Sequence, residues 1–522
     1  MGDISMIELG RWIKKNWMLF FIMLIAIVSR SILIGKIPCG VHADEAFAGY
    51  EAYSLVKYGT DSWGYTNPIY LTTWGSGMSV LESYLMIPFV MLFGLNLITI
   101  RLPQMILGIV SVLVVYLLYR RIADKNKAIF AAMMITVCPW HIMMSRWGLD
   151  ANLAPSFILL SMYFSLLGLS KEKYLIISAV FWGLTLYCYA LVWLFVPFFL
   201  LFSLGYCMKY HKIRVSKYTI SAAVILLLFA VPLLLFVAVN IGLISEIRTP
   251  YISIPRLVQF RGDELNGTHV LTNLKDLLRI YIKQSDYNLM NAVPYFGLYY
   301  LYSLPFIIVG LYDVIRTVYY NSKQKKFGYE IFLLIWLVIC TVIGLMRSMS
   351  VHRANCMNLA MLFLLIRGSY YVGQNFKRTW IWKGIIALYF VSFCLFEGYY
   401  FTAYQNAIKE MQLAGAQDAL VYAATLKEEY NSDVIYITGR LRHPQVLFYS
   451  QYPTDLYMKT VAWKNYPSGW LVADHFGDFY WDTDGEKKDA DGIYVICSDE
   501  ISEYKNAGYY ITEFDACAVA FR

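Results

Sequence analysis

The 522-residue chain is too apolar for an ordinary soluble protein, since 59% of its residues are hydrophobic and only 15% are charged. Its mean hydropathy of +0.50 indicates a surface that faces lipid. Short basic loops between apolar segments account for the formal net charge of +8, so the charge gives no separate argument for binding nucleic acid. The composition therefore predicts an α-helical polytopic membrane protein.

Eleven apolar segments have about the length that a helix needs to cross a hydrocarbon core roughly 30 Å thick. They lie near residues 17–35, 101–119, 128–145, 152–169, 174–189, 190–208, 218–241, 295–315, 329–346, 356–372 and 383–402. No small-residue cleavage site follows the first segment and many spans come after it, so we expect an anchor and not a removed signal peptide. The sequence thus predicts about eleven transmembrane helices.

Lysine and arginine gather in loops that fall on alternate sides of consecutive spans, and cytoplasmic loops hold the excess of these residues. The basic loops are RWIKKNW near the N-terminus, RRIADKNK, SKEK, KYHKIRVSK, NSKQKK and NFKRTWIWK. We therefore place the N-terminus in the cytoplasm. The C-terminal segment is then outside, together with the loops at 36–100, 145–151, 242–294 and 347–355.

One apolar stretch, MSVLESYLMIPFVMLFG at residues 78–94, does not fit this scheme as a span, because a crossing there would put RRIADKNK outside. We predict instead a helix that lies at the outer membrane surface. The alternative is a true span, which would make twelve spans and place the C-terminus inside.

The composition changes near residue 403, where charged residues become common. A helical stretch at 410–430 precedes the strand-like runs SDVIYITG, QVLFYSQ, DGIYVIC and GYYITEF. This pattern predicts a small extracytoplasmic α/β domain over residues 403–522, beside a transmembrane domain over residues 1–402. Cys497 and Cys517 lie in strand-like runs of this region, where a disulfide could form outside the cell.

Four polar clusters sit at the outer ends of predicted spans, where ionisable residues are costly and tend to mark a site. They are HADEA at 42–46, the aromatic loop at 61–77, SRWGLDAN at 145–152 and SMSVHRAN at 348–355. Asp44, Glu45 or Asp150 could serve as a general base or a cation ligand, and a solvated acidic turn is the alternative. His42 fits a hydrogen-bonding neighbour better than a metal ligand.

Arg30, Arg146 and Arg353 also lie near the outer ends of spans, against the positive-inside trend. Guanidinium groups bind phosphate well. The alternative is that these side chains extend to outer lipid headgroups. The tryptophans and tyrosines at 61–77 could stack on a sugar ring, but interfacial aromatic belts are commoner, so none is assigned as a ligand.

The ordered series HADEA, WGSG, a helix ending in LFG, TIRLPQMILGIVSVLVVYLLYRR and PWHIMMSRWGLDAN resembles the GT-C superfamily of membrane glycosyltransferases. Within that superfamily the chain is similar to bacterial relatives of the dolichyl-phosphate-mannose protein mannosyltransferases and of the lipid A aminoarabinose transferases. The resemblance covers about residues 10–170 well and the later spans in outline. TTWGSGMSVLES replaces the His-Pro-Pro type segment that many of these enzymes carry, so the acceptor is unassigned.

The resemblance implies an inverting transfer of a sugar from a polyprenyl-phosphate donor to a protein, glycan or lipid acceptor at the outer face of the bilayer. It makes Asp44 the catalytic base, Glu45 its supporting partner and Asp150 a second carboxylate near the site. One carboxylate suffices as base, because the lipid phosphate is a competent leaving group that needs no general acid. Some relatives use a divalent cation, for which Asp150 and Glu45 are the candidate ligands, so the metal dependence is left open.

Substrate binding falls to basic residues in this interpretation, since the growing charge on the phosphate needs stabilisation. Arg353 and Arg146 are the first candidates, with His42 and His352 beside them.

Two functions from other classes compete with this interpretation. A transporter or lipid flippase would bind a coupling cation at the outer carboxylates, but transporters usually place ionisable residues and broken helices near the middle of the membrane. A binding or assembly protein would keep the fold without the chemistry. The polar clusters lie at the ends of clean spans, which favours an enzyme.

Overall fold

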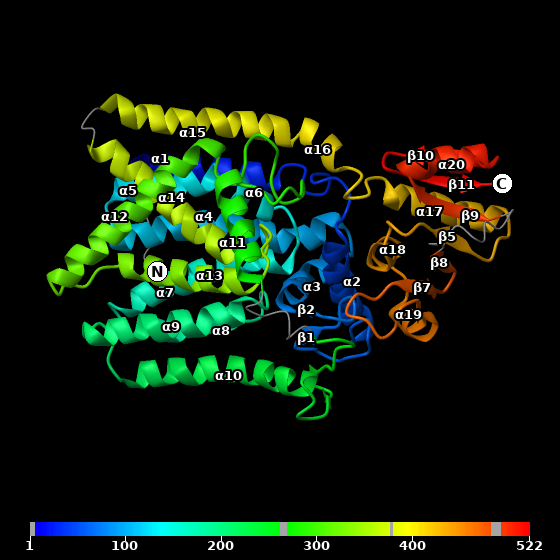
Figure 1. The fold of residues 1–522 in the computed structure, drawn as a ribbon, viewed down its shortest axis with the longest axis horizontal. Coiled ribbons are helices and arrows are strands. Elements are labelled where there is room, and N and C mark those ends of the chain that lie inside the picture. The colour runs from blue at the N-terminus through cyan, green and yellow to red at the C-terminus, as the bar shows by residue number, and fades with distance from the viewer. Residues whose placement is uncertain (1–5, 261–268, 376–378, 482–491) are drawn as a thin grey trace.

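The computed structural model describes residues 6–260, 269–375, 379–481 and 492–522. Figure 1 shows two parts side by side: a bundle of long helices, and a region with a β-sheet that contains the C-terminus. Helices α2 (Ala43–Tyr58) and α3 (Leu81–Phe93), with the short strands β1 (Tyr70–Leu71) and β2 (Met78–Ser79), lie between these two parts. The predicted combination of a helical membrane bundle and a C-terminal sheet region is confirmed.

The bundle is built from the predicted apolar segments. Its helices are α1 (Met6–Ser31), α4 (Leu97–Ile122), α5 (Lys125–Thr136), α7 (Asp150–Gly168), α8 (Tyr174–Thr185), α9 (Val192–Lys209), α10 (Lys217–Asn240), α12 (Leu304–Lys323), α13 (Glu330–Met346), α14 (Asn355–Asn375) and α15 (Thr379–Tyr400). Within the described residues, seven helices are long and apolar enough to cross a membrane. The predicted spans near 17–35, 174–189 and 329–346 correspond to shorter apolar helices. The chain is a multi-pass membrane protein.

The predicted span at 128–145 is interrupted in the structure. Helix α5 ends at Thr136, and a separate short helix, α6 (Pro139–Met144), follows it. Pro139 occupies the start of α6, and a residue before proline is driven out of the helical conformation, so Cys138 is extended. All six residues of α6 are nevertheless buried, so the break lies inside the protein.

Helix α3 occupies the stretch that we expected to lie at the membrane surface. Its 13 residues correspond to about 20 Å of helix, which is shorter than the hydrocarbon core of roughly 30 Å. Its length therefore agrees with an interfacial helix, and its place relative to the membrane stays a prediction.

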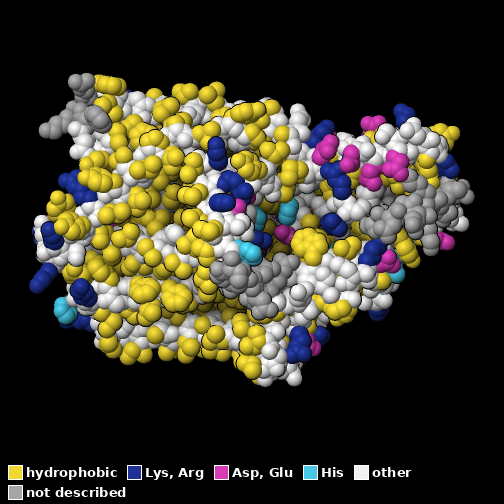
Figure 2. Space-filling model, viewed as in Figure 1, with side chains coloured by type: hydrophobic (Ala, Val, Ile, Leu, Met, Phe, Trp, Pro, Cys, Tyr) yellow, Lys and Arg dark blue, Asp and Glu magenta, His cyan; other side chains and the backbone are white. Residues whose placement is uncertain are grey.

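Basic side chains of the described residues gather at one end of the bundle. Figure 2 shows Lys and Arg side chains along the end farthest from the C-terminal sheet, while the flank of the bundle is largely apolar. This separation is what the charge pattern predicts for a cytoplasmic end and an opposite, outer end. The orientation of the termini stays a prediction, and we name the two ends the basic end and the sheet end.

A long connection between α10 and α12 returns to the sheet end. It contains the strands β3 (Ile247–Arg248) and β4 (Ser253–Ile254), helix α11 (Val270–Leu278) and a single π-helical turn at Arg279–Lys283. The main-chain N–H of Ile69 donates to the carbonyl of Ser253. This hydrogen bond joins the connection to the loop at 36–100, which we call the first long loop.

The C-terminal region holds a seven-stranded mixed sheet in the order β10-β11-β9-β5-β8-β7-β6. Strand β5 (Ile435–Ile437) runs parallel to β8 (Phe479–Trp481) and β9 (Ile493–Cys497), and the other neighbours are antiparallel. The remaining strands are β6 (Ala462–Trp463), β7 (Ala473–Phe476), β10 (Tyr510–Phe514) and β11 (Cys517–Phe521). The helices of this region are α17 (Ala416–Glu429), α18 (His443–Ser450), α19 (Thr454–Thr460) and α20 (Ile501–Asn506). Helix α16 (Ala403–Ile408) follows α15 and packs in the core of the bundle.

One predicted strand of this region is wrong. Residues 445–450 of the run QVLFYSQ lie in helix α18, which has Pro444 in its first turn and in which Val446, Leu447 and Phe448 are buried. A short apolar run carries too little periodicity to separate a strand from a buried helical turn. The disulfide that the sequence allowed between Cys497 and Cys517 is not formed: the two residues are opposed across β9 and β11, and both thiols are free.

The first long loop and the C-terminal region share one hydrophobic core. Phe47 and Tyr50 of α2 pack in the same buried cluster as Phe448 of α18 and strand residues of the sheet. The Tyr50 hydroxyl donates to the carbonyl of Tyr452 at 2.7 Å, and the Gln445 amide donates to the carbonyl of Val41 at 2.8 Å. The division of the chain at residues 402 and 403 stays a prediction, because this core crosses it.

Candidate active site

Asp44 lies in the first turn of α2, at the junction of the bundle and the C-terminal region. His42 caps this helix, because its Nδ1 accepts a hydrogen bond from the Asp44 main-chain N–H at 3.2 Å. The positive end of the helix dipole favours a carboxylate in the first turn. The role of His42 in the structure is therefore to start α2 and hold Asp44 at its tip.

The Asp44 side chain is oriented but still reaches solvent. The indole N–H of Trp74 donates to its Oδ1 at 2.8 Å, and the His42 Nδ1 lies 3.8 Å from its Oδ2. The side chain keeps 30% of its surface exposed. This carboxylate is held in place and can still accept a proton from a molecule in solution.

Glu45 points the other way, into the protein. Its Oε1 and Oε2 accept hydrogen bonds from Nε and a terminal nitrogen of Arg101 at 2.8 and 3.1 Å, and Oε1 also accepts the Gly148 N–H at 3.0 Å. Both side chains are fully buried. The remaining Arg101 donors bind the carbonyls of Ile34, Pro38 and Gly40. The two neighbouring acids of HADEA thus have different environments: Asp44 reaches solvent, whereas Glu45 is buried against Arg101.

Asp150 begins α7 and faces the same region as Asp44. Its Oδ2 accepts the Ser79 N–H at 3.3 Å and its Oδ1 accepts the Ala151 N–H at 2.6 Å. The two carboxylates lie within electrostatic range of each other. The ends of α2 and α7, about a hundred residues apart in sequence, therefore bring together a pair of acids.

The loop between α13 and α14 brings basic groups to the same place. Burial, with the nearby charges of Arg353 and His42, lowers the pKa of His352 to about 4, so its imidazole is neutral at neutral pH. Asp44 lies within electrostatic range of this ring. Tyr189 contacts Arg353 and feels the charge of Asp150, which places Arg353 on the same side. We call His42, Asp44, Asp150, His352 and Arg353 the Asp44 cluster.

Figure 2 shows a hollow between the bundle and the C-terminal region in which Lys and Arg, Asp and Glu, and His side chains gather. Histidine is scarce in this chain, with seven residues in all, and several of them lie at this hollow. A hollow lined by charges of both signs can hold a polar ligand at the edge of an apolar bundle.

Arg146 and Arg30 do not join the Asp44 cluster. The terminal nitrogens of Arg146 donate to the carbonyls of Ser29, Ile32 and Ile37 at 2.7 to 3.0 Å, and the guanidinium lies over the ring of Phe401. Arg30 is fully buried and binds the carbonyls of Ile135 and Thr136. Neither side chain extends to lipid headgroups; both satisfy main-chain groups where helices end.

Sequence reasoning missed two further residues at the site. Arg347 ends α13 and lies within electrostatic range of Tyr189 and Tyr70. It directly precedes the SMSVHRAN cluster, so the argument that found Arg353 could also have found it. Asp286 accepts the Val351 N–H at 3.0 Å and so shapes the same loop, but no sequence signal separates it from other acids of its long connection.

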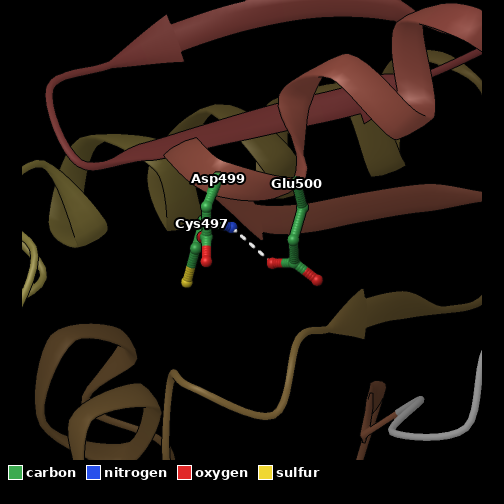
Figure 3. Close-up of side chains that lie close together, drawn as sticks. All are labelled: Cys497, Asp499 and Glu500. Carbon is green, nitrogen blue, oxygen red and sulfur yellow. Dashed lines mark hydrogen bonds between the residues drawn. The ribbon is translucent and has the colours of Figure 1, made fainter.

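The two carboxylates considered as possible cation ligands, Glu45 and Asp150, both have hydrogen-bond partners in the protein. Both oxygens of Glu45 are taken by Arg101, and each oxygen of Asp150 accepts a main-chain N–H. In the part of the chain that the structure describes, the one group of three residues with metal-ligand spacing is Cys497, Asp499 and Glu500, in the C-terminal sheet. Figure 3 shows the Glu500 carboxylate accepting the Cys497 N–H, at 2.9 Å. Asp499 also pairs with Arg440, at 2.7 Å.

Comparison with known proteins identifies the fold. Residues 79–236 match the family model described as dolichyl-phosphate-mannose-protein mannosyltransferase. The structure is similar to that of ArnT from Cupriavidus metallidurans in the apo state, with a TM-score of 0.57, 12% sequence identity and 98% of each chain covered. A second structure of that protein, bound to undecaprenyl phosphate, gives a TM-score of 0.51 at 12% identity with 97% of each chain covered. A search of curated protein sequences finds no match.

The similarity extends from one end of the chain to the other, including the C-terminal region. It shows the fold, which is similar to that of ArnT. Together with the match of residues 79–236 to the mannosyltransferase family model, this fold confirms the predicted resemblance.

Proposed function

We propose that this GT-C-fold membrane protein is a glycosyltransferase that moves a sugar from a polyprenyl-phosphate donor to an acceptor hydroxyl at the sheet end of the bundle. One observation carries the proposal: Asp44 is an oriented, partly exposed carboxylate that faces a loop bearing Arg353 and a neutral His352. The fold supports it, because ArnT, which has a similar fold over its whole length, was solved with undecaprenyl phosphate bound.

In the proposed reaction, Asp44 takes the proton of the acceptor hydroxyl as the hydroxyl oxygen attacks the anomeric carbon. The new bond forms on the face opposite the phosphate, so the configuration at that carbon is inverted. The bond from the anomeric carbon to the phosphate oxygen breaks, and polyprenyl phosphate leaves with the electron pair. A phosphate leaves without general acid help, so one base is enough.

Three other members of the Asp44 cluster, Arg353, Asp150 and His352, have roles in this proposal that follow from their chemistry. Arg353 carries a positive charge that stabilises the phosphate as it leaves. Asp150, when it is ionised, would stabilise the positive character of the sugar ring in the transition state. His352 is neutral and can hydrogen-bond to the sugar or the phosphate.

Glu45 and Arg146 take no part in the chemistry of this proposal. Glu45 holds the start of α2 in place through its ion pair with Arg101. Because Asp44 is the preceding residue, this ion pair also fixes the position of Asp44. Arg146 fastens the end of α1 to the segment before α7. The roles proposed here are those of the chain's own side chains, and the metal dependence is left open.

Substitution of Asp44 tests the proposal. Asp44→Asn keeps the size of the side chain but removes the base, so we expect transfer from a polyprenyl-phosphate sugar to fall by about 10²- to 10⁴-fold. Thermal unfolding should stay close to that of the wild type, because Asp44 is partly exposed. Transfer is measured in membranes with a labelled donor.

A matched control is Asp418→Asn. Asp418 is also an acid in the first turn of a helix, α17, but it is exposed and belongs to the C-terminal region. We expect this variant to transfer sugar as the wild type does. Near-normal transfer by Asp44→Asn would contradict the assignment of the base.

A further inference from the structure

We infer that the C-terminal region completes the active site by holding Trp74, whose indole N–H positions the Asp44 carboxylate. This inference rests on the proposed function and assigns a part to a region that the reaction itself does not use. Trp74 is a positioning residue here, because it would act on the substrate only through Asp44.

The contact between the two side chains is short and protected. The Trp74 Nε1 lies 2.8 Å from the Asp44 Oδ1, and Trp74 is only 6% exposed. An indole can only donate a hydrogen bond, so it always presents the same proton to the carboxylate. Hydrogen bonds to charged groups are stronger than neutral ones, so this contact fixes the rotation of the carboxylate.

Two side chains of the C-terminal region hold the indole. Trp470 stacks on its face, with ring centroids 4.5 Å apart and planes within 9° of parallel. His443 packs against it at 5.2 Å with the rings nearly perpendicular, at 77°. Burial, and then the charge of Arg442, lowers the pKa of His443 to about 3, so this ring packs as a neutral group. The orientation of the indole is therefore set by residues almost 400 positions away in the sequence.

The main chain holds Trp74 at the same point. The Leu471 N–H donates to the Trp74 carbonyl at 2.8 Å, and Gly75 pairs with Trp470 in an isolated β-bridge. Trp74 itself has a φ of +54°, a left-handed conformation that bulky residues rarely adopt. Such a conformation persists only where the surroundings enforce it, and here the enforcing contacts include the C-terminal region.

Through Trp74, this arrangement links the Oδ1 atom of Asp44 to the C-terminal region. The other oxygen, Oδ2, lies on the side of His42. The oxygen that Trp74 binds would accept this hydrogen bond less strongly once it was protonated, so proton transfer to that oxygen is disfavoured. Oδ2 is then the oxygen that receives the proton, and the indole decides which way it points.

Trp74→Phe tests the inference, because it keeps an aromatic ring against Trp470 and removes the N–H together with part of the indole volume. The control variant Trp481→Phe loses the same volume. Loss of a hydrogen bond to a charged group corresponds to about a 10- to 100-fold effect, and we expect that fall in kcat. The KM for the lipid donor should change by less than about twofold, since the donor does not touch Trp74 in the proposed reaction. Trp470→Leu, which removes the stacking surface, should also lower kcat.

The double variant Trp74→Phe/Trp470→Leu shows whether both act through one hydrogen bond. If they do, the combined loss of kcat is smaller than the product of the two single losses. If the fall in kcat of the double variant equals the product of the two single falls, the two residues act independently and the inferred coupling is wrong.

Trp481→Phe is the matched control for packing. Trp481 is also a buried indole, 3% exposed, and its N–H donates to the Leu441 carbonyl at 2.7 Å, but it does not contact Asp44. We expect this variant to lose stability to a similar degree and to keep its kcat. A wild-type kcat for Trp74→Phe, or an equal loss for Trp481→Phe, would overturn the inference.

The two proposals can fail separately. If the folded wild-type protein transfers no sugar, the proposed function is wrong. If the wild type is active, Asp44→Asn is inactive and Trp74→Phe is normal, only the positioning of Asp44 by the C-terminal region is wrong.

Discussion

The neighbouring acids Asp44 and Glu45 offer a direct comparison of a reacting and a structural carboxylate. Glu45→Gln changes one atom of a fully buried side chain that binds Arg101 through both oxygens. The new amide N–H₂ group would face a terminal nitrogen of Arg101, so two donors would meet. The Arg101 guanidinium would then remain buried without its counter-charge.

The structure sets the expected size of this effect. Removing one partner of a buried ion pair typically costs about 3 to 5 kcal/mol, because the other charge is left uncompensated. An exposed pair contributes much less, about 0 to 1 kcal/mol. Asp515 pairs with Lys409 at 3.1 Å with side chains 51% and 37% exposed, so Asp515→Asn should have a small effect. Asn also tolerates the left-handed backbone of this position, where φ is +56°.

Equilibrium unfolding in mixed detergent micelles measures both variants. We expect Glu45→Gln to lower the free energy of unfolding by several times as much as Asp515→Asn. Below its unfolding temperature, Glu45→Gln should retain more transfer activity than Asp44→Asn. If Glu45→Gln unfolds like the wild type but transfers no sugar, Glu45 acts in the chemistry and our interpretation of its ion pair is wrong.

Two further predictions concern the first long loop. Gly75→Ala would place a Cβ atom 2.3 Å from the Ser468 carbonyl oxygen at a φ of +86°, whereas Gly59→Ala meets no atom within 4 Å at a φ of +74°. We expect a larger fall in unfolding temperature for Gly75→Ala, and equal falls would contradict the tight contact with the C-terminal region. Burial raises the pKa of Asp61 from 3.8 to about 7, and burial together with the Asp61 charge raises that of Glu51. The folded protein therefore binds the protons of the Asp61 and Glu51 carboxyl groups more tightly than the unfolded chain does. The contribution of these two groups to the free energy of unfolding is full below about pH 4 and is lost as the pH rises through about 7. Unfolding temperatures measured from about pH 5 to pH 8 should fall with rising pH, and less steeply in Glu51→Gln; parallel profiles would refute this.

Much of the membrane architecture can be predicted from the sequence because it depends on local composition. Apolar runs of sufficient length give the helices of the bundle, and the alternating basic loops give the separation of the two ends. The place of Asp44 at the sheet end of the bundle also follows locally, since HADEA comes soon after the first apolar segment. The break at Pro139 was missed because the apolar composition continues across it.

The roles of individual charged residues depend on distant contacts and could not be predicted in the same way. Arg146 and Arg353 look alike in sequence, each at the end of a span, but only the fold brings main-chain carbonyls of the first span to Arg146. Glu45 is one residue from Asp44, and its closed environment depends on Arg101, 56 positions away. The contact of Trp74 with Trp470 joins two segments that no local pattern relates.

The release of polyprenyl phosphate by the purified protein is the most direct measurement of the proposed reaction. The protein is reconstituted in vesicles with polyprenyl-phosphate sugars of known anomeric configuration and a membrane extract as the source of acceptors. We expect the wild type to release free polyprenyl phosphate and form a product of inverted configuration, Asp418→Asn to do the same, and Asp44→Asn to do neither. Folded wild-type protein that releases no polyprenyl phosphate from any donor, or a product of retained configuration, would contradict the proposal.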